Sequence, residues 1–453
     1  MNTNKNYLFE TMKPSKALAV MAIPTVLSQM IILLYNLADT WFIGQSNNPY
    51  MIGASSLALT IFLVSTALSN VFGVGGGSLM ARLIGEKKND VAKKVVSYTL
   101  KMALISSLFF SIIIFITMNP LLKILGANEN TMEYARQYII TTTVIGALPN
   151  VMTMCMAQLL RNSGYSKEAG IGIMFGSILN IALDPLFMFV LLAKGNEVLG
   201  AGLATLFSSI CSFIYFIVYF YKLRNKTVLT ISRKKENLEK KYKKSLYSVG
   251  IPAAIAILLF DIITIITNRI AVSYGDMSLA AMGIVLKVER IPINLGLGIC
   301  LGMVPLVAYN HGSKNRKRVK QFFSLTLKTN IIFSSLSAIL FYLFSSSIVS
   351  LFIKNGETIS QGTIFLKGRC FALPFMMIGY VITNYMNAIG EGKVSFLLAL
   401  IRHIVFIIPI MILMNAILGI NGCIWSEIVA DLANAIVAFI IFVKVNKKIA
   451  ESQ

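Results

Sequence analysis

The sequence predicts an all-α integral membrane protein with twelve transmembrane helices in two six-helix bundles. The first observation behind this prediction is composition: 56% of the 453 residues are hydrophobic, only 13% are charged, and the mean hydropathy is +0.74. Soluble domains carry roughly 25% charged residues, so this chain belongs in a lipid bilayer. The other two observations are an internal repeat and a basic segment between its copies.

The internal repeat consists of four short motifs that recur in the same order, about 225 to 228 residues further on. The pairs are Ile23-Pro24 and Ile251-Pro252, Ser97-x-Thr99-Leu100 and Ser324-x-Thr326-Leu327, Ala147-Leu148-Pro149 and Ala372-Leu373-Pro374, and Gly164-x-x-Lys167 and Gly390-x-x-Lys393. Such a series indicates a duplicated chain. We predict an N-terminal six-helix lobe over residues 1–221 and a C-terminal six-helix lobe over residues 245–453. Because each copy has an even number of spans, a pseudo-twofold axis along the membrane normal should relate them.

A basic segment, residues 222–244, joins the two copies. Its Lys and Arg residues are Lys222, Arg224, Lys226, Arg233, Lys234, Lys235, Lys240, Lys241, Lys243 and Lys244. Nucleic-acid binding would place basic residues on one face of a domain, whereas in this chain they cluster in short connections between apolar runs. We therefore predict a cytoplasmic linker and no nucleic-acid partner.

Twelve apolar runs are long enough to cross the hydrocarbon core, which takes about 20 residues each. They cover roughly residues 16–43, 51–84, 92–118, 131–159, 168–192 and 199–221, then 245–274, 279–312, 319–345, 359–388, 394–415 and 420–444. When the connections are assigned alternately to the two sides, nearly all their Lys and Arg fall on one side, which places both termini and the linker in the cytoplasm. No small-residue cleavage site follows the polar N-terminus, so we expect the first run to be retained as a span.

Prolines and glycines interrupt several spans. Pro24 and the equivalent Pro252 each remove one backbone hydrogen bond and favour a bend, which is either a static kink or a hinge. The glycines from Gly73 to Gly77 lack the spacing of a phosphate-binding loop, so close helix packing is the expected use. The chain shows neither a GxSxG nor an HExxH motif, and we expect no enzyme and no cofactor.

Six carboxylates lie inside the predicted spans, where an ionisable group costs about 2.5 to 3.5 kcal/mol. They are Asp39, Asp184, Asp261, Glu289, Glu427 and Asp431. In the first copy, topology brings four polar residues to a similar depth: Asp39, Asn180, Asp184 and Thr205. Their oxygen atoms suit a hard cation, and paired carboxylates also suit a shared proton. The alternative is that these residues only hydrogen-bond neighbouring helices.

The carboxylates of the second copy have two interpretations. Asp261 and Glu289 can line a cavity that attracts organic cations, or they can neutralise basic residues of the same two spans, which are Lys287, Arg290 and Arg269. Glu427 and Asp431 are four residues apart and share one face of the last span. For this second pair, a packing role and a transport role are both open.

Residues 21–44 resemble the first helix of the multidrug and toxic compound extrusion (MATE) family. The resemblance rests on Ile23-Pro24, on Asn36-x-x-Asp39 and on Ile43-Gly44, and it extends over essentially the whole chain. Further matching segments are Gly73 to Ala81, Arg161 to Gly164, Asn180 to Pro185, Gly200-x-Gly202 and Ala204-Thr205. The segment Lys287 to Arg290 looks like that of the multidrug exporters of Gram-positive bacteria.

The resemblance implies a V-shaped pair of six-helix lobes that exports cationic, lipophilic drugs in exchange for sodium ions or protons. The implied coupling-cation site, which is also the candidate sodium site, is Asp39, Asn180, Asp184 and Thr205. We assign Pro24 as the hinge, and we assign as substrate-binding residues Tyr35, Asn36, Gln158, Asp261 and Glu289. One branch of the family has an acidic residue in its tenth helix, where this chain has Asn384 and Asn387.

The expected setting is a bacterial cytoplasmic membrane, with a multi-pass monomer whose partners are organic-cation drugs and the lipid bilayer. The expected transported cation is a sodium ion or a proton. The alternative function is that of a flippase for lipid-linked saccharides, which is found among relatives of the same fold. A flippase cavity would need several basic residues for a pyrophosphate group, whereas the first copy has mainly acidic ones.

Overall fold

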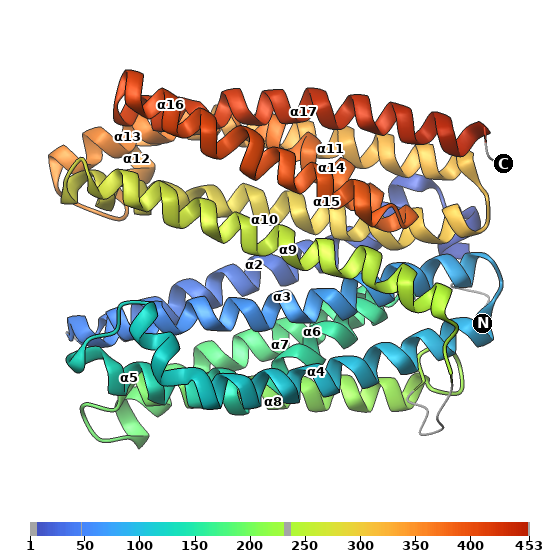
Figure 1. Cartoon of the computed structure of the whole chain (residues 1–453), viewed down its shortest axis with the longest axis horizontal. Helices are drawn as coiled ribbons and strands as arrows, with labels where there is room; N and C mark the ends of the chain where they lie inside the picture. Colours follow the sequence, from blue (N-terminus) through green and yellow to red (C-terminus); the bar gives the residue numbers. More distant parts are fainter. Residues whose placement is uncertain (1–6, 47, 231–236, 452–453) are drawn as a thin grey trace.

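The computed structural model describes residues 7–46, 48–230 and 237–451, and every regular element in these ranges is a helix (Figure 1). Four basic residues of the N-terminus and the linker, both predicted to be cytoplasmic, lie outside the described residues: Lys5, Arg233, Lys234 and Lys235. Figure 1 shows the helices of the first half beside those of the second, with both termini at the same end of the molecule. This end is called the terminal end below, and the opposite end is called the distal end.

The described residues of the first half contain ten elements, three of which are short π-helical stretches labelled η. They are η1 (Tyr7–Thr11), α2 (Pro14–Gly44), α3 (Pro49–Gly85), α4 (Asn89–Ile124), α5 (Glu129–Ile139), η2 (Ile140–Ile145), α6 (Ala147–Asn162), α7 (Ser166–Pro185), η3 (Leu186–Leu191) and α8 (Glu197–Leu223). The turn η1 precedes the first span and was not predicted.

The second half repeats the order of the long helices, with a short helix added after the third of them and with no counterparts of η1 and η2 among the described residues. Its elements are α9 (Lys240–Val272), α10 (Asp276–Gly312), α11 (Arg316–Leu343), α12 (Ser345–Ser350), α13 (Gly356–Cys370), α14 (Leu373–Ile389), α15 (Gly392–Leu400), η4 (Ile401–Ile407), α16 (Ile408–Leu418) and α17 (Ile420–Glu451). Within the described ranges, α5 with α6 corresponds to α13 with α14.

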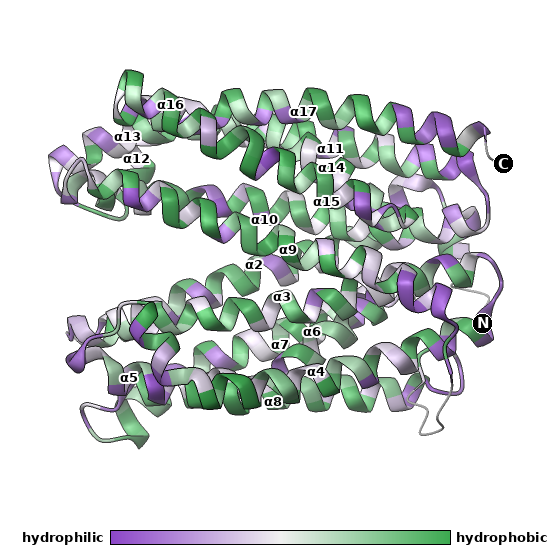
Figure 2. Cartoon of the chain, viewed as in Figure 1, coloured by the Kyte–Doolittle hydropathy of each residue, from purple (hydrophilic) through white to green (hydrophobic). Residues whose placement is uncertain are grey.

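Ten of the described helices are long and apolar enough to cross a membrane, and two bent pairs bring the number to twelve. Figure 2 shows hydrophobic residues along the helices and hydrophilic residues gathered toward their ends. The prediction of twelve spans in an all-α membrane protein is therefore confirmed. The pairs bend by 48° before Ala147 and by 47° before Leu373. Both bends fall on the repeated Ala-Leu-Pro motif, because proline fits the first turn of a helix but not its interior.

The connection between the halves is shorter than the predicted linker. Helix α8 ends at Leu223 and α9 already begins at Lys240, so the last lysines of the basic segment belong to α9. The apolar run marks only the part of a helix that lies in hydrocarbon, and lysine is a good helix former that lets α9 continue into water. Val228, Leu229 and Leu238 of the connection are buried against the protein.

The two halves meet through two equivalent contacts, in which α3 packs against α9 and α10 packs against α2. Gly75 of α3 lies against the backbone of Gly250, and Gly302 of α10 lies against the backbone of Ala22. The turns after α3 and α10 also match, because Lys87 and Lys314 have φ values of 62° and 58°. These repeated features support a pseudo-twofold relationship between the halves.

Polar contacts join the halves at the terminal end. Arg82 of α3 donates to the carbonyl oxygen of Ile389 at 3.0 Å and to the Ser245 hydroxyl at 3.3 Å. Ser78 of α3 donates to the carbonyl oxygen of Asn387 at 2.5 Å. In this arrangement α3 therefore touches both α9 and α14, and the terminal ends of the two halves are held together.

The turn η1 lies across the second half at the same end. The Phe9 ring stacks on the Tyr309 ring with centroids 4.6 Å apart, and the Tyr309 hydroxyl donates to Glu10 Oε1 at 2.6 Å. Arg318 Nε donates to the carbonyl oxygen of Phe9 at 2.9 Å, and Asn310 Nδ2 donates to the same oxygen at 3.1 Å. The N-terminal segment therefore connects α2 of the first half to α10 and α11 of the second.

Candidate ion and substrate site

Asp39 lies in the last turns of α2, near the distal end. The Tyr138 hydroxyl of α5 donates a hydrogen bond to Asp39 Oδ2 at 3.2 Å. The other carboxylate oxygen, Oδ1, is buried and has no hydrogen-bond partner in the described part of the chain. A buried oxygen without a donor is an incomplete site, because such groups are normally satisfied by protein, water or a ligand.

Asp184, Asn180 and Thr205 form a buried polar group between α7 and α8. Their exposed fractions are 0%, 2% and 5%. Asn180 precedes Asp184 by four residues, so both side chains point from the same face of α7. The Asn180 amide nitrogen lies 3.5 Å from Asp184 Oδ1 and 3.2 Å from the Thr205 hydroxyl. With the amide turned over, its nitrogen donates to Asp184 Oδ2 at 3.3 Å and its oxygen accepts from Thr205.

Neither Asp39 nor Asp184 forms an ion pair with a basic residue anywhere in the described ranges. Asp39 lies on α2 and Asp184 on α7, and these two helices pack against each other. Two carboxylates with an amide, a hydroxyl and a phenol nearby provide oxygen ligands for a hard monovalent cation, or acceptors for a proton. The structure thus joins Asn180, Asp184 and Thr205 and places Asp39 on the adjacent helix. The assignment of these four residues as the coupling-cation site stays a prediction.

The other predicted residues of the first half occupy different surroundings. Tyr35 is half-buried and Asn36 is exposed on α2. Gln158 of α6 accepts a hydrogen bond from Arg161 at 2.9 Å, and its side chain packs against Gly73 of α3. Pro24 lies inside α2 with its carbonyl group against Gly170 of α7, so the α2–α7 contact is close at Pro24. Its assignment as a hinge stays a prediction.

Asp261 of α9 is half-buried and lies 4.0 Å from Arg290 Nη2 on α10. This distance is the upper limit for an ion pair, and the Arg290 guanidinium also lies over the Phe260 ring at 5.2 Å. Asp261 Oδ2 is buried without a hydrogen bond. Of the three basic residues considered as partners from the sequence, Arg290 is the one that approaches Asp261.

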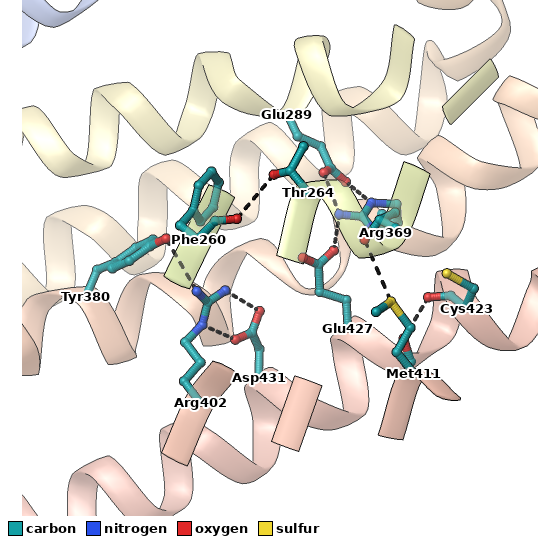
Figure 3. A network of polar contacts seen from close by, with 12 residues as sticks. Phe260, Thr264, Glu289, Arg369, Tyr380, Arg402, Met411, Cys423, Glu427 and Asp431 are labelled. Atoms are coloured by element: carbon teal, nitrogen blue, oxygen red, sulfur yellow. Dashed lines mark hydrogen bonds and ion pairs between the residues drawn. The ribbon is translucent and has the colours of Figure 1, made fainter. Parts of the chain in front are cut away.

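Glu289 is 4% exposed and is held by Arg369 of α13, as Figure 3 shows. Arg369 donates to the two Glu289 carboxylate oxygens at 2.9 and 3.0 Å. Its Nη2 nitrogen also lies 2.5 Å from Glu427 Oε2 on α17. Both oxygens of Glu289 are therefore occupied by a basic residue that the sequence analysis did not consider. The assignment of Glu289 as a substrate contact stays a prediction.

Asp431, one turn after Glu427 on α17, pairs with Arg402 of η4 (Figure 3). Arg402 donates to the two Asp431 oxygens at 2.7 and 3.2 Å. Its Nη1 nitrogen lies 3.4 Å from the Tyr380 hydroxyl and 3.0 Å from His403 Nε2. His403 Nδ1 lies 2.9 Å from the carbonyl oxygen of Ala399. Because an arginine can only donate, this geometry requires a neutral His403 with its proton on Nδ1.

The two halves differ in charge balance. The buried network of the second half, defined as Glu289, Arg369, Arg402, Glu427 and Asp431, contains three carboxylates and two guanidiniums. The first-half site contains two carboxylates and no guanidinium. Tyr138, Arg369 and Arg402 were not predicted from the sequence. The same rule that singled out the acids, the cost of an ionisable group in hydrocarbon, would have found the two arginines.

Twelve candidate spans in two repeated halves, with buried ionisable groups between the helices, define the architecture of a secondary transporter. The sequence model of the MatE family matches residues 24–186 and 252–413. These two matches cover more than half of the chain, and the chain belongs to the MatE family. The resemblance drawn from the sequence is confirmed.

The chain is also similar to named relatives over almost its full length. The multidrug export protein MepA of Staphylococcus saprophyticus is 27% identical over 441 residues, which are 97% of this chain and 96% of the relative. MepA of Staphylococcus aureus strain MRSA252 is 28% identical with the same coverage.

Solved structures show the same fold. An outward-facing multidrug resistance MATE family transporter of the MOP superfamily aligns with a TM-score of 0.93 at 23% identity and full coverage of both chains. A MATE protein in its straight conformation aligns with a TM-score of 0.92 at 24% identity. At these identities the likeness establishes the fold alone.

Proposed function

We propose that this chain is a multidrug exporter that expels cationic, lipophilic compounds by antiport with sodium ions or protons. The observation that carries the proposal is the pair Asp39 and Asp184, two carboxylates in the membrane-spanning part with no basic partner among the described residues. Such a costly arrangement is retained where an ion visits it. The relatives named multidrug export proteins support the same function.

In the proposed mechanism, α2 to α8 and α9 to α17 act as two lobes that move relative to each other. An organic cation enters between them from the cytoplasmic side, attracted by the partly paired Asp261. An external cation then occupies Asp39, Asn180, Asp184 and Thr205 and favours the state that releases the drug outside. Antiport requires that the drug and the coupling cation prefer different conformations of the transporter.

The test is transport by the purified protein in proteoliposomes with ethidium as the probe. Sodium and proton gradients are imposed separately, which identifies the coupling ion. Gradient-driven ethidium movement should disappear in Asp39→Asn and in Asp184→Asn, because each removes a charge from the cation site. Asp276→Asn is the matched control, since this carboxylate is exposed in the first turn of α10.

Asp184→Asn protein that inserts normally, elutes as the wild type does and moves ethidium at the wild-type rate would contradict the assignment of the cation site. Ethidium binding to purified protein tests the substrate class separately. If ethidium fails to bind but a lipid-linked pyrophosphate saccharide does, the flippase alternative replaces the exporter. No observation favours that alternative, because Arg369 and Arg402 are already engaged by carboxylates.

The proposed setting is the bacterial cytoplasmic membrane, with the terminal end in the cytoplasm. This orientation follows from the basic connections at that end, including the turns at Lys87 and Lys314. This orientation is tested by replacing Lys88 or Asn196 with cysteine, Lys88→Cys or Asn196→Cys, and labelling each variant in intact cells with an impermeant maleimide. Labelling at Asn196 and protection at Lys88 are expected. We propose that the monomer is the working unit, which the mass of the detergent-solubilised particle checks.

A further inference from the structure

A two-part cavity lies between the first turns of α9 and α15, at the terminal end of the second half. Its polar part has a volume of about 280 Å³ and is lined by Lys241, Lys244, Ser248 and the segment Gly390–Lys393. Its apolar part has a volume of about 650 Å³, and the apolar side chains that line it include Ile251, Phe396, Leu397 and Leu400. Lys244, Ser248 and Lys393 line both parts, so the two parts are adjacent.

The polar part is suited to an anion. Lys241 is paired with Glu239 at 2.7 Å, whereas neither Lys244 nor Lys393 forms an ion pair within the described ranges. Gly392 and Lys393 open helix α15, so their amide N–H groups have no acceptor inside the helix. Helix N-termini favour negative charge. The carboxylate of Glu391 also lines this part. The side chains of Lys244, Lys393 and Glu391 together therefore carry one net positive charge.

The apolar part extends from these lysines toward the middle of the membrane. Ile251 and Leu400 are each seven residues beyond Lys244 and Lys393, which is about 10 Å along a helix at 1.5 Å per residue. Ile251 and Leu397 are both 47% exposed, so this surface faces the surroundings rather than the interior of the protein. A polar pocket large enough for a phosphate group thus adjoins a hydrophobic groove between α9 and α15.

We propose that this cavity binds an anionic phospholipid of the adjacent leaflet. Its phosphate lies between Lys244 and Lys393 at the start of α15, and one acyl chain lies in the groove between α9 and α15. A soluble phosphate compound would leave the groove empty, and a cationic drug would be repelled by the net positive charge of the polar part. This inference concerns a surface separate from the cation site and does not depend on which compound the protein exports.

The position of the cavity gives the bound lipid a structural effect. Ser245, which also lines the polar part, accepts a hydrogen bond from Arg82 of the first half, and Arg82 also binds Ile389 next to Gly390. A lipid that fixes the starts of α9 and α15 therefore stabilises the surface against which α3 packs. Binding of the anionic lipid should favour the arrangement in which the terminal ends of the two halves are in contact.

The test uses the purified, delipidated full chain in detergent, with dioleoyl phosphatidylglycerol as the probe and bound lipid counted by native mass spectrometry. Dioleoyl phosphatidylcholine serves as the zwitterionic lipid, and glycerol 3-phosphate serves as the soluble headgroup. Wild-type protein should bind phosphatidylglycerol more tightly than either. Since a basic residue near anionic lipid contributes about 1 kcal/mol, Lys244→Gln and Lys393→Gln should each weaken binding about fivefold, and the double variant roughly twenty- to thirtyfold.

Lys317→Gln with Lys320→Gln is the matched control, because both lysines are exposed at the same end on α11 and lie outside the cavity. This pair should leave lipid binding unchanged. Leu400→Trp, which fills the groove, should weaken phosphatidylglycerol binding and leave glycerol 3-phosphate binding as it was. Equal affinity for the two lipids, or equal losses in the cavity and control pairs, would overturn the proposal. Glycerol 3-phosphate binding as tight as phosphatidylglycerol binding would also overturn it.

Discussion

Arg369 is the shared partner of Glu289 and Glu427: it donates two hydrogen bonds to Glu289, and its Nη2 nitrogen also lies 2.5 Å from Glu427. One guanidinium therefore faces two carboxylates that are at most 8% exposed. A buried charge that loses its partner costs far more than a well-balanced pair contributes. The consequences of changing the three residues should accordingly differ.

Glu427→Gln should leave the free energy of unfolding within about 1 kcal/mol of the wild-type value, because it removes the surplus charge and keeps the Arg369–Glu289 pair. Arg369→Gln should lower it by about 3 to 5 kcal/mol, because two buried carboxylates then face no cation. Thermal unfolding in one detergent measures both. If Glu427→Gln and Arg369→Gln lowered the free energy of unfolding equally, Glu427 would not carry a surplus charge in the folded state.

The pair Arg402 and Asp431 is balanced one to one, so its single and double variants should behave differently. Asp431→Asn should destabilise the protein by about 3 to 5 kcal/mol, because it leaves the buried guanidinium without a counter-charge. The double variant Arg402→Met with Asp431→Leu should recover most of this loss, since no buried charge remains. A double variant less stable than Asp431→Asn would contradict this account. Thermal unfolding measures all three proteins.

Gly250 allows α9 to touch α3, because a Cβ atom at this position would meet the carbonyl oxygen of Val71. Backbone cannot move aside as a side-chain tip can, so Gly250→Ala should separate the two helices at a cost of about 1 to 3 kcal/mol. Spin labels at Lys94 and Lys320 should show a longer or broader distance distribution. Gly283→Ala is the control, because no atom lies within 4 Å of a Cβ atom added there.

Tyr309→Phe should loosen the N-terminal turn without disturbing the second half. The substitution removes the 2.6 Å hydrogen bond to Glu10 and retains the ring that stacks on Phe9. Hydrogen bonds to charged groups contribute about 1.5 to 3 kcal/mol, so the amides of residues 7–12 should exchange roughly tenfold faster or more. Tyr98→Phe, which removes a 3.2 Å hydrogen bond to Tyr247 elsewhere at this end, should leave their exchange unchanged.

Much of the fold could be predicted from the sequence because hydrocarbon imposes strong rules on it. The length of the apolar runs determined the twelve spans, and the repeated Ala-Leu-Pro motif marks the two bends. The boundary of α9 was predicted five residues too late, since the helix continues past the apolar run into water. The turn η1 was missed because its position depends on contacts with Tyr309 and Arg318, which lie about 300 residues away in the sequence.

The candidate site was predicted unevenly for a physical reason. Asp39, Asn180, Asp184 and Thr205 could be grouped because topology fixes the depth of each residue along its span. Depth does not tell which helices are neighbours, so Tyr138 could not be assigned to Asp39. For the same reason Glu289 was compared with basic residues of its own and the preceding span, whereas its partner Arg369 lies on α13. Which side chains of different helices contact each other depends on how the helices pack, and sequence periodicity does not determine that packing.

The contact of Gly75 with Gly250 and that of Gly302 with Ala22 are two copies of one surface pairing. The chain is in this respect a fused isologous dimer, in which each protomer offers the other the same patch. A rotation about the symmetry axis must therefore strain or relax both patches together. A bulky residue introduced at Gly75 or at Gly302 should impede the same relative rotation of the two halves. Bulky residues at both positions should therefore act on one shared motion rather than on two independent hinges.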